Sequence, residues 1–276
     1  MSTTAAIVGL TLAAIGGAGH AKDLSPQQKK DAVVQLLKSL ESKDATALKY
    51  INPNKYIQHN LQVEDGLPGL KKLVASLPTD TKVNIVRTLA DGNFVVTHTE
   101  YNFFGPKVGF DIFRFEDGKI VEHWDNLEGK CEQPNASGRT QTDGPSEIKD
   151  LDKTEANKAL LREYFELVVI GGHRDQASRF RDNFHQHNCF GEDNKSGAQV
   201  TSGPFAKPGF VYKVNTVHRI LGEGNFVLVV NEGLFDNKPS IFYDFYRVEN
   251  KRIVEHWDVI EEIPPAAQRK NTNGKL

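Results

Sequence analysis

The spacing of apolar residues changes from helical to strand-like along the chain, and it does so twice. After Ser25 the apolar residues fall on one helical face, and Ser25 and Gln28 have the spacing of a capping box. These apolar residues are Val33, Leu36, Leu37 and Leu40. Further short helices are predicted at 44–50 and 70–77. Runs rich in Val, Ile, Phe and Thr, divided by Asp-Gly and Gly-Pro turns, then predict strands at 83–89, 94–104, 108–115 and 120–127.

The second part of the chain repeats this order. Asp152 and Glu155 have the capping-box spacing, and a helix is predicted from there through Val168, followed by a short helix at 176–181. Strands are predicted at 212–221, 226–235, 241–248 and 253–261. Residues 191–209, rich in Gly, Pro and Ser, stand where the first part has its third helix. Helices followed by an antiparallel meander in each part predict an α+β fold.

The two parts also share words of sequence. Residues 111–125 (DIFRFEDGKIVEHWD) and 244–258 (DFYRVENKRIVEHWD) align without a gap and are identical at 9 of 15 positions. Gln-His-Asn at 58–60 recurs at 186–188. A repeat of this length is a duplicated domain, since solenoid repeats span only about 20–50 residues. We predict a first domain at 22–130, a linker at 131–151 and a second domain at 152–276.

The first 21 residues resemble a cleaved secretory signal. Residues 5–18 are apolar or small and uncharged, and small residues precede a cleavage position after Ala21. No Lys or Arg stands before the apolar run, which is shorter and richer in glycine than a transmembrane helix. We therefore expect a secreted or periplasmic protein without a membrane partner. A net charge of −2 and the lack of a basic block also argue against nucleic acid as a partner.

The chain has two cysteines, and motifs for cofactors are absent. Cys131 and Cys189 permit one disulfide in an oxidising compartment, although the spacing alone leaves their pairing open. The sequence contains no phosphate-binding glycine loop, no HExxH pair and no CxxC pair. We therefore expect no metal and no cofactor.

The order of elements and the repeated words resemble a known family. Helices first, a meander after, a last hairpin reading DIFRFEDGKIVEHWD, and the words QHN, GEGNFV and IVEHWDVIE are similar to SnoaL-like polyketide cyclases and the predicted SnoaL-like aldol-condensation group. These belong to the nuclear-transport-factor-2-like superfamily. The resemblance implies two tandem cone-shaped domains, each with N-terminal helices packed on a curved antiparallel sheet around its own pocket. It also implies an intramolecular pseudo-dimer, with a further homodimer possible.

The repeated His-Trp-Asp word is the main candidate for chemistry. On a strand alternate residues share a face, so His123 groups with Asp125 and His256 with Asp258, while Trp124 points the other way. A partly buried carboxylate beside an imidazole suits proton transfer at carbon next to a carbonyl. The family resemblance likewise implies an acid–base Asp in the pocket. The alternative is structural: Asp125 would pair with Arg114.

Other repeated polar residues are candidates for substrate binding. The predicted substrate-binding residues are His59, Asn60, His187, Asn188, Asp111, Asp244, Glu100 and Glu232. For the histidines the alternative is helix capping or a hydrogen bond to the backbone. Tyr101 of the first part is matched by Gly233 in the second, so the two pockets are not expected to be equivalent.

These features support two functional hypotheses. The first is a cofactor-independent acid–base enzyme, of aldol, cyclase, isomerase or dehydratase type, acting on a small apolar carbonyl or polyketide-like compound. The second is a non-catalytic protein that binds a small apolar molecule. In a variant of the first, one domain is catalytic and the other is a degenerate partner.

Overall fold

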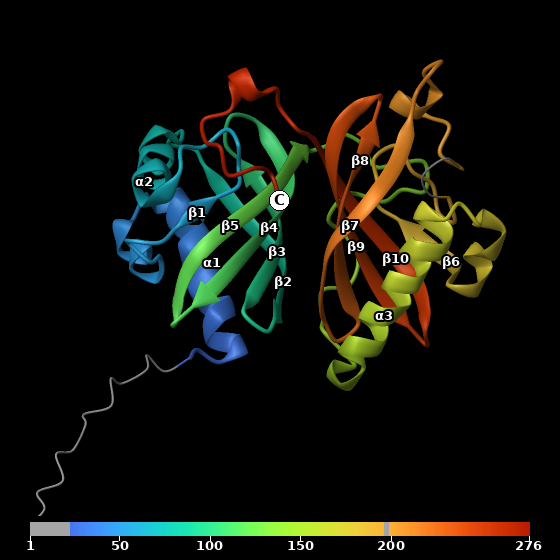
Figure 1. Ribbon diagram of the computed structural model, residues 1–276, viewed down its shortest axis with the longest axis horizontal. Helices are drawn as coiled ribbons and strands as arrows, with labels where there is room; N and C mark the ends of the chain where they lie inside the picture. The colour runs from blue at the N-terminus through green and yellow to red at the C-terminus, as the bar shows by residue number, and fades with distance from the viewer. Residues whose placement is uncertain (1–22, 196–198) are drawn as a thin grey trace, which may run out of the picture.

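The computed structural model describes residues 23–195 and 199–276, so the predicted signal segment lies outside the described residues. The chain forms two halves, each with one five-stranded sheet, and Figure 1 shows the sheets facing each other with the helices outside. No helix within these two ranges is long and apolar enough to cross a membrane. The helices are α1 (Pro26–Ser42), η1 (Ala45–Tyr50), α2 (Gly66–Ser76), η2 (Leu151–Lys153), α3 (Thr154–Tyr164), η3 (Phe165–Ile170), η4 (Arg174–Arg179), η6 (Gly203–Ala206) and η7 (Ala266–Gln268). The strands are β1 (Ile57–Gln58), β2 (Lys82–Asp91), β3 (Phe94–Asn102), β4 (Pro106–Glu116), β5 (Lys119–Gly129), β6 (Arg181–Gln186), β7 (Tyr212–Glu223), β8 (Phe226–Phe235), β9 (Lys238–Glu249) and β10 (Arg252–Glu262).

The helices of the first half begin where local signals place them. The capping box before α1 is confirmed, since Ser25 Oγ accepts from the Gln28 N–H (3.2 Å) and Gln28 Oε1 accepts from the Ser25 N–H (2.9 Å). The predicted third helix starts earlier than expected, at Gly66. Gly66 has a φ of 72°, which glycine adopts readily, and Pro68 lies in the first turn, where no backbone N–H is needed.

The second half departs from the first at its helices. The predicted capping box at Asp152 and Glu155 is wrong, because the turn η2 precedes α3 and no side chain caps the helix. α3 continues directly into the π-helical turn η3. In the part of 191–211 that is described, the structure is mainly loop with the short 3₁₀ turn η6, as the composition predicted.

The α+β fold is confirmed, but each sheet is mixed rather than purely antiparallel. The strand orders are β1-β5-β4-β3-β2 and β6-β10-β9-β8-β7. β1 runs parallel to β5 with Gln58 opposite His123, and β6 runs parallel to β10 with Gln186 opposite His256. The chain thus returns from the helices along the edge of the sheet and places a glutamine beside each histidine.

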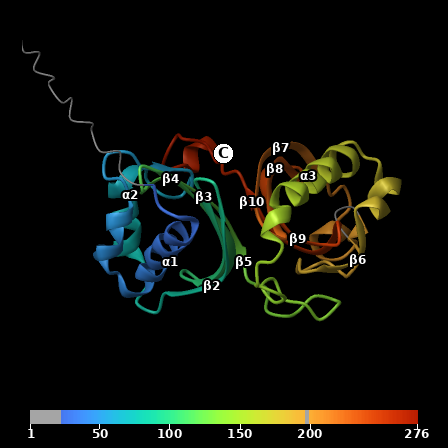
Figure 2. The same ribbon diagram turned by 90° about the horizontal axis from the view of Figure 1, so that it is seen from below.

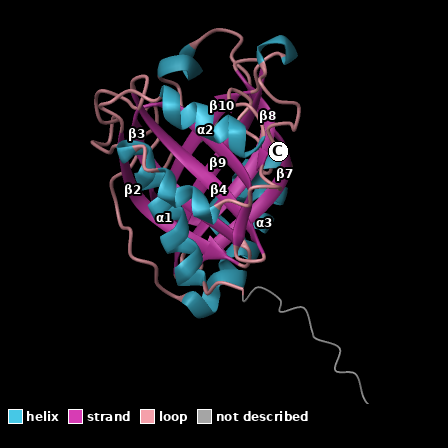
Figure 3. Cartoon of the chain, turned by 90° about the vertical axis from the view of Figure 1, so that its left-hand side faces the viewer, coloured by secondary structure: helices cyan, strands magenta, loops and turns pink. Residues whose placement is uncertain are grey.

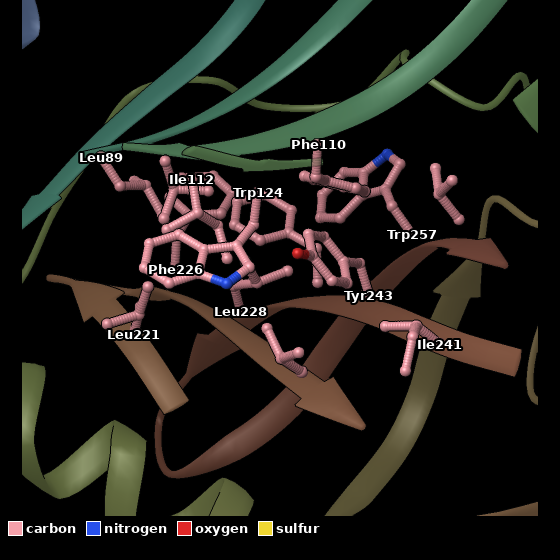
Figure 4. Packing of buried hydrophobic residues seen from close by; sticks show 14 of the residues in the cluster. Leu89, Phe110, Ile112, Trp124, Leu221, Phe226, Leu228, Ile241, Tyr243 and Trp257 are labelled. Carbon is pink, nitrogen blue, oxygen red and sulfur yellow. The ribbon is translucent and has the colours of Figure 1, made fainter. Parts of the chain in front are cut away.

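The outer faces of the two sheets pack against each other to form a pseudo-dimer within one chain. Figure 4 shows Trp124 and Phe110 of one sheet among Tyr243, Phe226 and Trp257 of the other, all almost fully buried. Each half also contributes one arginine to the partner's tryptophan. The Arg87 guanidinium lies 4.2 Å from the Trp257 ring, and the Arg219 guanidinium lies 4.3 Å from the Trp124 ring.

The segment after each half crosses to the other half. We name residues 131–150 the linker arm and residues 263–276 the C-terminal arm. Figures 1 and 2 show the C-terminal arm, in red, passing from the second sheet onto the first half. The Asn271 amide donates to the carbonyls of Asn60 (2.8 Å) and Val63 (2.9 Å).

The linker arm makes the matching contacts on the second half. The Asn135 amide donates to the carbonyls of Gln186 (2.6 Å) and Asn188 (3.1 Å). The disulfide Cys131–Cys189, with Cα atoms 6.2 Å apart, fastens this arm. The two arms therefore exchange between halves in the same manner.

Candidate functional site

Three side chains from two neighbouring strands meet on the inner face of each sheet. Asp111 on β4 stands directly opposite Asp125 on β5, and Asp244 on β9 stands opposite Asp258 on β10. His123 and His256 lie two residues before the second aspartate of each pair, so all three side chains share one face, as the alternation predicted. Figure 3 shows the first half from its helix side, with α1 and α2 in front of the sheet that carries these residues.

A glutamine, a histidine and an aspartate form a hydrogen-bonded relay in the first half. Gln58 Oε1 accepts from the Asn60 N–H (2.9 Å), which fixes this oxygen as an acceptor towards His123 Nδ1 at 2.9 Å. His123 Nδ1 therefore carries a proton. His123 Nε2 lies 3.2 Å from Asp111 Oδ1, and one proton must lie between these two atoms for them to bond.

The second half builds the same relay. Gln186 Oε1 accepts from the Asn188 N–H (3.1 Å) and lies 3.0 Å from His256 Nδ1. His256 Nε2 is 3.0 Å from Asp244 Oδ1. The relay thus stores one proton in each half, as an imidazolium beside a carboxylate or as a neutral pair.

The outer oxygen of the relay aspartate has different donors in the two halves. Asp111 Oδ2 accepts from the Tyr101 hydroxyl (2.6 Å) and the Thr97 hydroxyl (3.1 Å). Asp244 Oδ2 accepts from the Asn231 amide (2.7 Å), and Gly233 stands where the first half has Tyr101. The expected inequivalence of the sites therefore begins at this oxygen.

The second aspartate differs more. Asp125 Oδ2 accepts from the Asn60 amide (2.7 Å), while the buried Lys275 ammonium lies 3.4 Å from Oδ1. Asp258 is held by the Asn188 amide at 2.9 and 3.1 Å, and no described Lys or Arg forms an ion pair with it. Burial raises the pKa of Asp258, and the neighbouring Asp244 adds to this, against the opposing effects of His256 and Asn188. The alternative ion pair between Asp125 and Arg114 is not formed, because Arg114 pairs with Glu122 and Glu116.

Each triad lies at the wall of its own cavity. The cavity of the first half has a volume of about 490 Å³ and is walled mainly by leucines and aromatic residues around Asp111, His123 and Asp125. The cavity of the second half has a volume of about 320 Å³ and contains Asp244, His256 and Asp258 in its wall. Asn60 and Asn188 line the same cavities, so these predicted residues are brought together.

Four other predicted substrate-binding residues lie elsewhere. His59 stacks on Trp124 with 4.7 Å between ring centroids, and its ring nitrogens face Glu122 Oε1 (2.9 Å) and the Gly274 carbonyl (3.0 Å). His187 likewise stacks on Trp257. Both histidines lie on the interface side of their sheets and line neither described cavity. This agrees with the alternative interpretation, in which they form hydrogen bonds to the backbone.

Glu100 and Glu232 also lie away from the described cavities. Glu100 binds Lys130 and Thr142 on the linker side, and Glu232 binds His218 near the surface. Strand alternation places both residues on the face opposite the relay, because they differ by an odd number from Thr97 and Asn231 along their strands.

Sequence reasoning missed a glutamate that each half presents to the other. Glu261 of β10 lines the first cavity, accepts from the Leu127 N–H (2.9 Å) and pairs with Lys275 (2.9 Å). Glu128 of β5 accepts from the Ile260 N–H (3.2 Å) and from the Gln141 amide. Burial, followed by the charge of Asp258, raises the pKa of Glu128 to about 8. Both glutamates stand three residues after the aspartate of the repeated word, which is the signal that could have revealed them.

A repeat in the arms was also missed. Asn135-Ala-Ser-Gly138-Arg139 and Asn271-Thr-Asn-Gly274-Lys275 have the same pattern, and both glycines have positive φ (76° and 84°). The final cations diverge. Arg139 binds Asp193 (2.7 Å) outside the site, whereas Lys275 enters the first site.

The triads also have the composition of a metal site. Asp111, His123 and Asp125 offer ligand atoms within 4.8 Å of one another, and Asp244, His256 and Asp258 do the same. In the first half the Lys275 ammonium beside Asp125 would repel a divalent cation. The second half has no such charge at Asp258, so a metal control belongs in any assay of that half.

No protein-family model and no curated protein matches the chain. Similar solved structures include TsrD from Streptomyces laurentii, with 21% identity, 38% of this chain and 92% of that chain covered, and a TM-score of 0.34. An NTF2-like protein of unknown function from Cytophaga hutchinsonii has 16% identity, coverages of 36% and 89%, and a TM-score of 0.32. An LEH-like epoxide hydrolase from M. tuberculosis has 18% identity, coverages of 37% and 84%, and a TM-score of 0.33.

Each of these likenesses spans a part of this chain the size of one half and most of the other protein. At such identities and TM-scores they carry no conclusion about the activity of this chain. Any activity has to be inferred from the site itself.

Proposed function

We propose that this protein is a cofactor-independent acid–base enzyme that moves a proton at carbon next to the carbonyl of a small compound, and that Asp258 is its base. The observation that carries this is the environment of Asp258. Its carboxylate faces a cavity, lies beside a relay that stores a proton, and has no cationic partner among the described side chains. A carboxylate with a raised pKa binds a proton more readily than an ordinary one, which a base for a weak carbon acid requires.

In the proposed step a carboxylate oxygen of Asp258 takes the proton from the carbon. The C–H electron pair then forms the enolate, whose negative charge rests largely on the carbonyl oxygen. The proton on Asp258 returns to the same carbon or to another position of the enolate. Asn188 orients Asp258 through its amide, and Gln186 fixes the His256 ring through the Nδ1 proton.

For the first half the favoured function is binding without proton transfer. The Lys275 ammonium lies 3.4 Å from Asp125 Oδ1, so this carboxylate has a cationic partner, which Asp258 lacks among the described side chains. The larger, mainly apolar cavity still suits a small apolar molecule. The proposed division thus assigns catalysis to the second half, in which the described residues form no counterpart of α2.

The test is exchange of carbon-bound protons for deuterium, which needs no knowledge of the full reaction. Heptan-2-one, cyclohexanone and 6-oxoheptanoate are incubated with the protein in D₂O, and loss of the signal of protons next to the carbonyl is followed by NMR. We expect exchange above the buffer rate and a loss of about 10²–10⁴-fold in Asp258→Asn, the usual contribution of a general base. Asp125→Asn serves as the matched control and should keep most of the exchange.

Two outcomes would contradict the proposal. One is exchange at the buffer rate with all three compounds, and the other is an equal loss in both variants. Melting temperatures of the variants exclude unfolding as the cause. Exchange that disappears on treatment with EDTA and returns with Zn²⁺ would assign the activity to a metal instead.

We further propose that the protein is exported. The predicted signal segment and the disulfide Cys131–Cys189 support this, because disulfides persist mainly in oxidising compartments. Sequencing the N-terminus of protein recovered from the culture medium or periplasm of its host tests it, and a mature chain beginning after Ala21 is expected.

A further inference from the structure

The cavity of the second half carries three positive side chains from three different elements. Arg174 comes from η4, Arg181 from β6 and Lys213 from β7, and all three line the same cavity as Asp244 and Asp258. Positive side chains outnumber the acidic ones in this lining.

None of the three has a carboxylate partner among the described side chains. Among the described residues Arg181 donates to two neutral acceptors, Gln199 Oε1 at 2.9 Å and the Asn194 carbonyl at 3.5 Å, and lies 4.6 Å from the Phe184 ring, while its buried Nε has no hydrogen-bond partner there. Arg174 and Lys213 are exposed, and their side chains form no hydrogen bond or ion pair with the described residues. A buried guanidinium nitrogen without an acceptor is costly, so an acceptor supplied by a ligand would stabilise this site.

Three other arginines that are at least partly buried have carboxylate partners. Arg114 binds Glu122 at 2.6 Å, Arg139 binds Asp193 at 2.7 Å and Arg247 binds Glu255 at 2.5 Å. Arg87 and Arg219 have no carboxylate either, but each of these lies over an interface tryptophan, whereas Arg181 lies in the wall of a cavity.

The first cavity has the opposite character. Counting back from the shared Gln-His-Asn word, the position equivalent to Arg181 is Pro53, which is uncharged. The first cavity is lined by two lysines and by the carboxylates of Asp111, Asp125 and Glu261. The first half thus has no charge at the position equivalent to Arg181, and acidic side chains outnumber Lys and Arg in the lining of its cavity.

We propose that the second cavity binds a carbonyl compound that also carries an anionic group, a carboxylate or a similar oxyanion, held by Arg181 with Arg174 and Lys213. The carbonyl part of this statement rests on the proposed function, while the anionic part rests on the cavity alone. Repulsion from Asp258 keeps the anionic group beside the cations and leaves the carbonyl end for the base. The ligand class is thus an oxo acid small enough for a cavity of about 320 Å³.

The test compares two probes that differ only in charge, 6-oxoheptanoate and its methyl ester, by isothermal titration calorimetry with the full chain. We expect the acid to bind at least about tenfold more tightly, as one charge-assisted hydrogen bond predicts. Arg181→Gln should remove most of this preference, and inorganic phosphate should compete with the acid. The double variant Arg174→Gln/Lys213→Gln changes only exposed side chains and should weaken the preference even if Arg181→Gln fails to fold.

The matched control is Arg179→Gln. Arg179 lies in the same turn as Arg174, is exposed, pairs with Glu163 and does not line the cavity, so the preference should persist. Equal binding of acid and ester, no binding of the acid, or a preference that survives in every variant would overturn the inference.

The two proposals fail separately. Asp258→Asn should abolish deuterium exchange while keeping or strengthening binding of the acid, because it removes a negative charge. A preference for the acid without any exchange would sustain the anionic site and refute the enzyme. Exchange of neutral ketones without a preference for the acid would sustain the enzyme and refute the anionic site.

Discussion

The two halves hold the same relay in different electrostatic surroundings. In the first half Lys275 lies between Asp125 and Glu261, so one buried cation balances two carboxylates. In the second half the equivalent carboxylates, Asp258 and Glu128, have amide donors and no cation among the described side chains. The comparison teaches that both copies keep the hydrogen-bonded geometry, whereas the charge directly beside the second aspartate depends on a single residue of an arm.

The largest effect on stability is expected from removing that cation. Lys275→Met leaves Asp125 and Glu261 buried and unpaired, and we expect the free energy of unfolding in urea to fall by about 3–5 kcal/mol. Lys270→Met, in the same arm but exposed and without a side-chain partner among the described residues, is the control and should be nearly neutral. If Lys275→Met is also neutral, the ion pairs do not hold the arm in place.

The covalent fastening of the linker arm ranks next. The disulfide closes a separation of 58 residues, so Cys131→Ser/Cys189→Ser should lower the free energy of unfolding by about 2–4 kcal/mol. A reducing agent breaks this disulfide, so it should lower the free energy of unfolding of the wild type to that of the variant. The variant has no disulfide to reduce and should be unchanged. An effect of reductant on the variant would show that the disulfide is not its target.

A smaller effect is expected at the relay aspartate. Tyr101→Phe removes one hydrogen bond to the buried Asp111 and should cost about 1–2 kcal/mol of unfolding free energy in urea melts. The control is Tyr50→Phe, whose hydroxyl bonds Gln35 at the surface and should matter little. Equal effects of the two changes would mean that the Tyr101 hydroxyl does not support the relay.

The smallest effect is expected in how the stability of the protein changes with pH. The pKa of Glu128 is raised to about 8 in the folded chain, so its contribution to stability is complete at low pH and is lost as the pH rises to about 8. Glu128→Gln should flatten the decline of the melting temperature across this range. The substitution also changes hydrogen bonds, but this shifts the melting temperature equally at every pH and leaves its slope with pH unaffected. A slope that is the same in Glu128→Gln and in the wild type would refute the raised pKa of Glu128.

Much of the fold followed from local sequence. The Ser25 capping box, the strands and the alternation that groups His123 with Asp125 depend on neighbours within a few residues, and all are present in the structure. The failed capping box at Asp152 shows the limit of such signals, because a preceding turn displaced the helix start.

The repeat, the α+β order and the shared face of the triads were thus determined by the sequence itself. Helical and strand periodicity depend on residues close together in the chain, and the repeat is visible when the chain is aligned with itself. Only the tertiary structure decided that His59 and His187 turn to the interface, that Glu128 and Glu261 face the opposite half, and that Lys275 enters the first site. These contacts join residues far apart in sequence. These contacts depend on the pseudo-dimer, which places the end of each half against the other half. No pattern among neighbouring residues predicts which distant residues come into contact in this way.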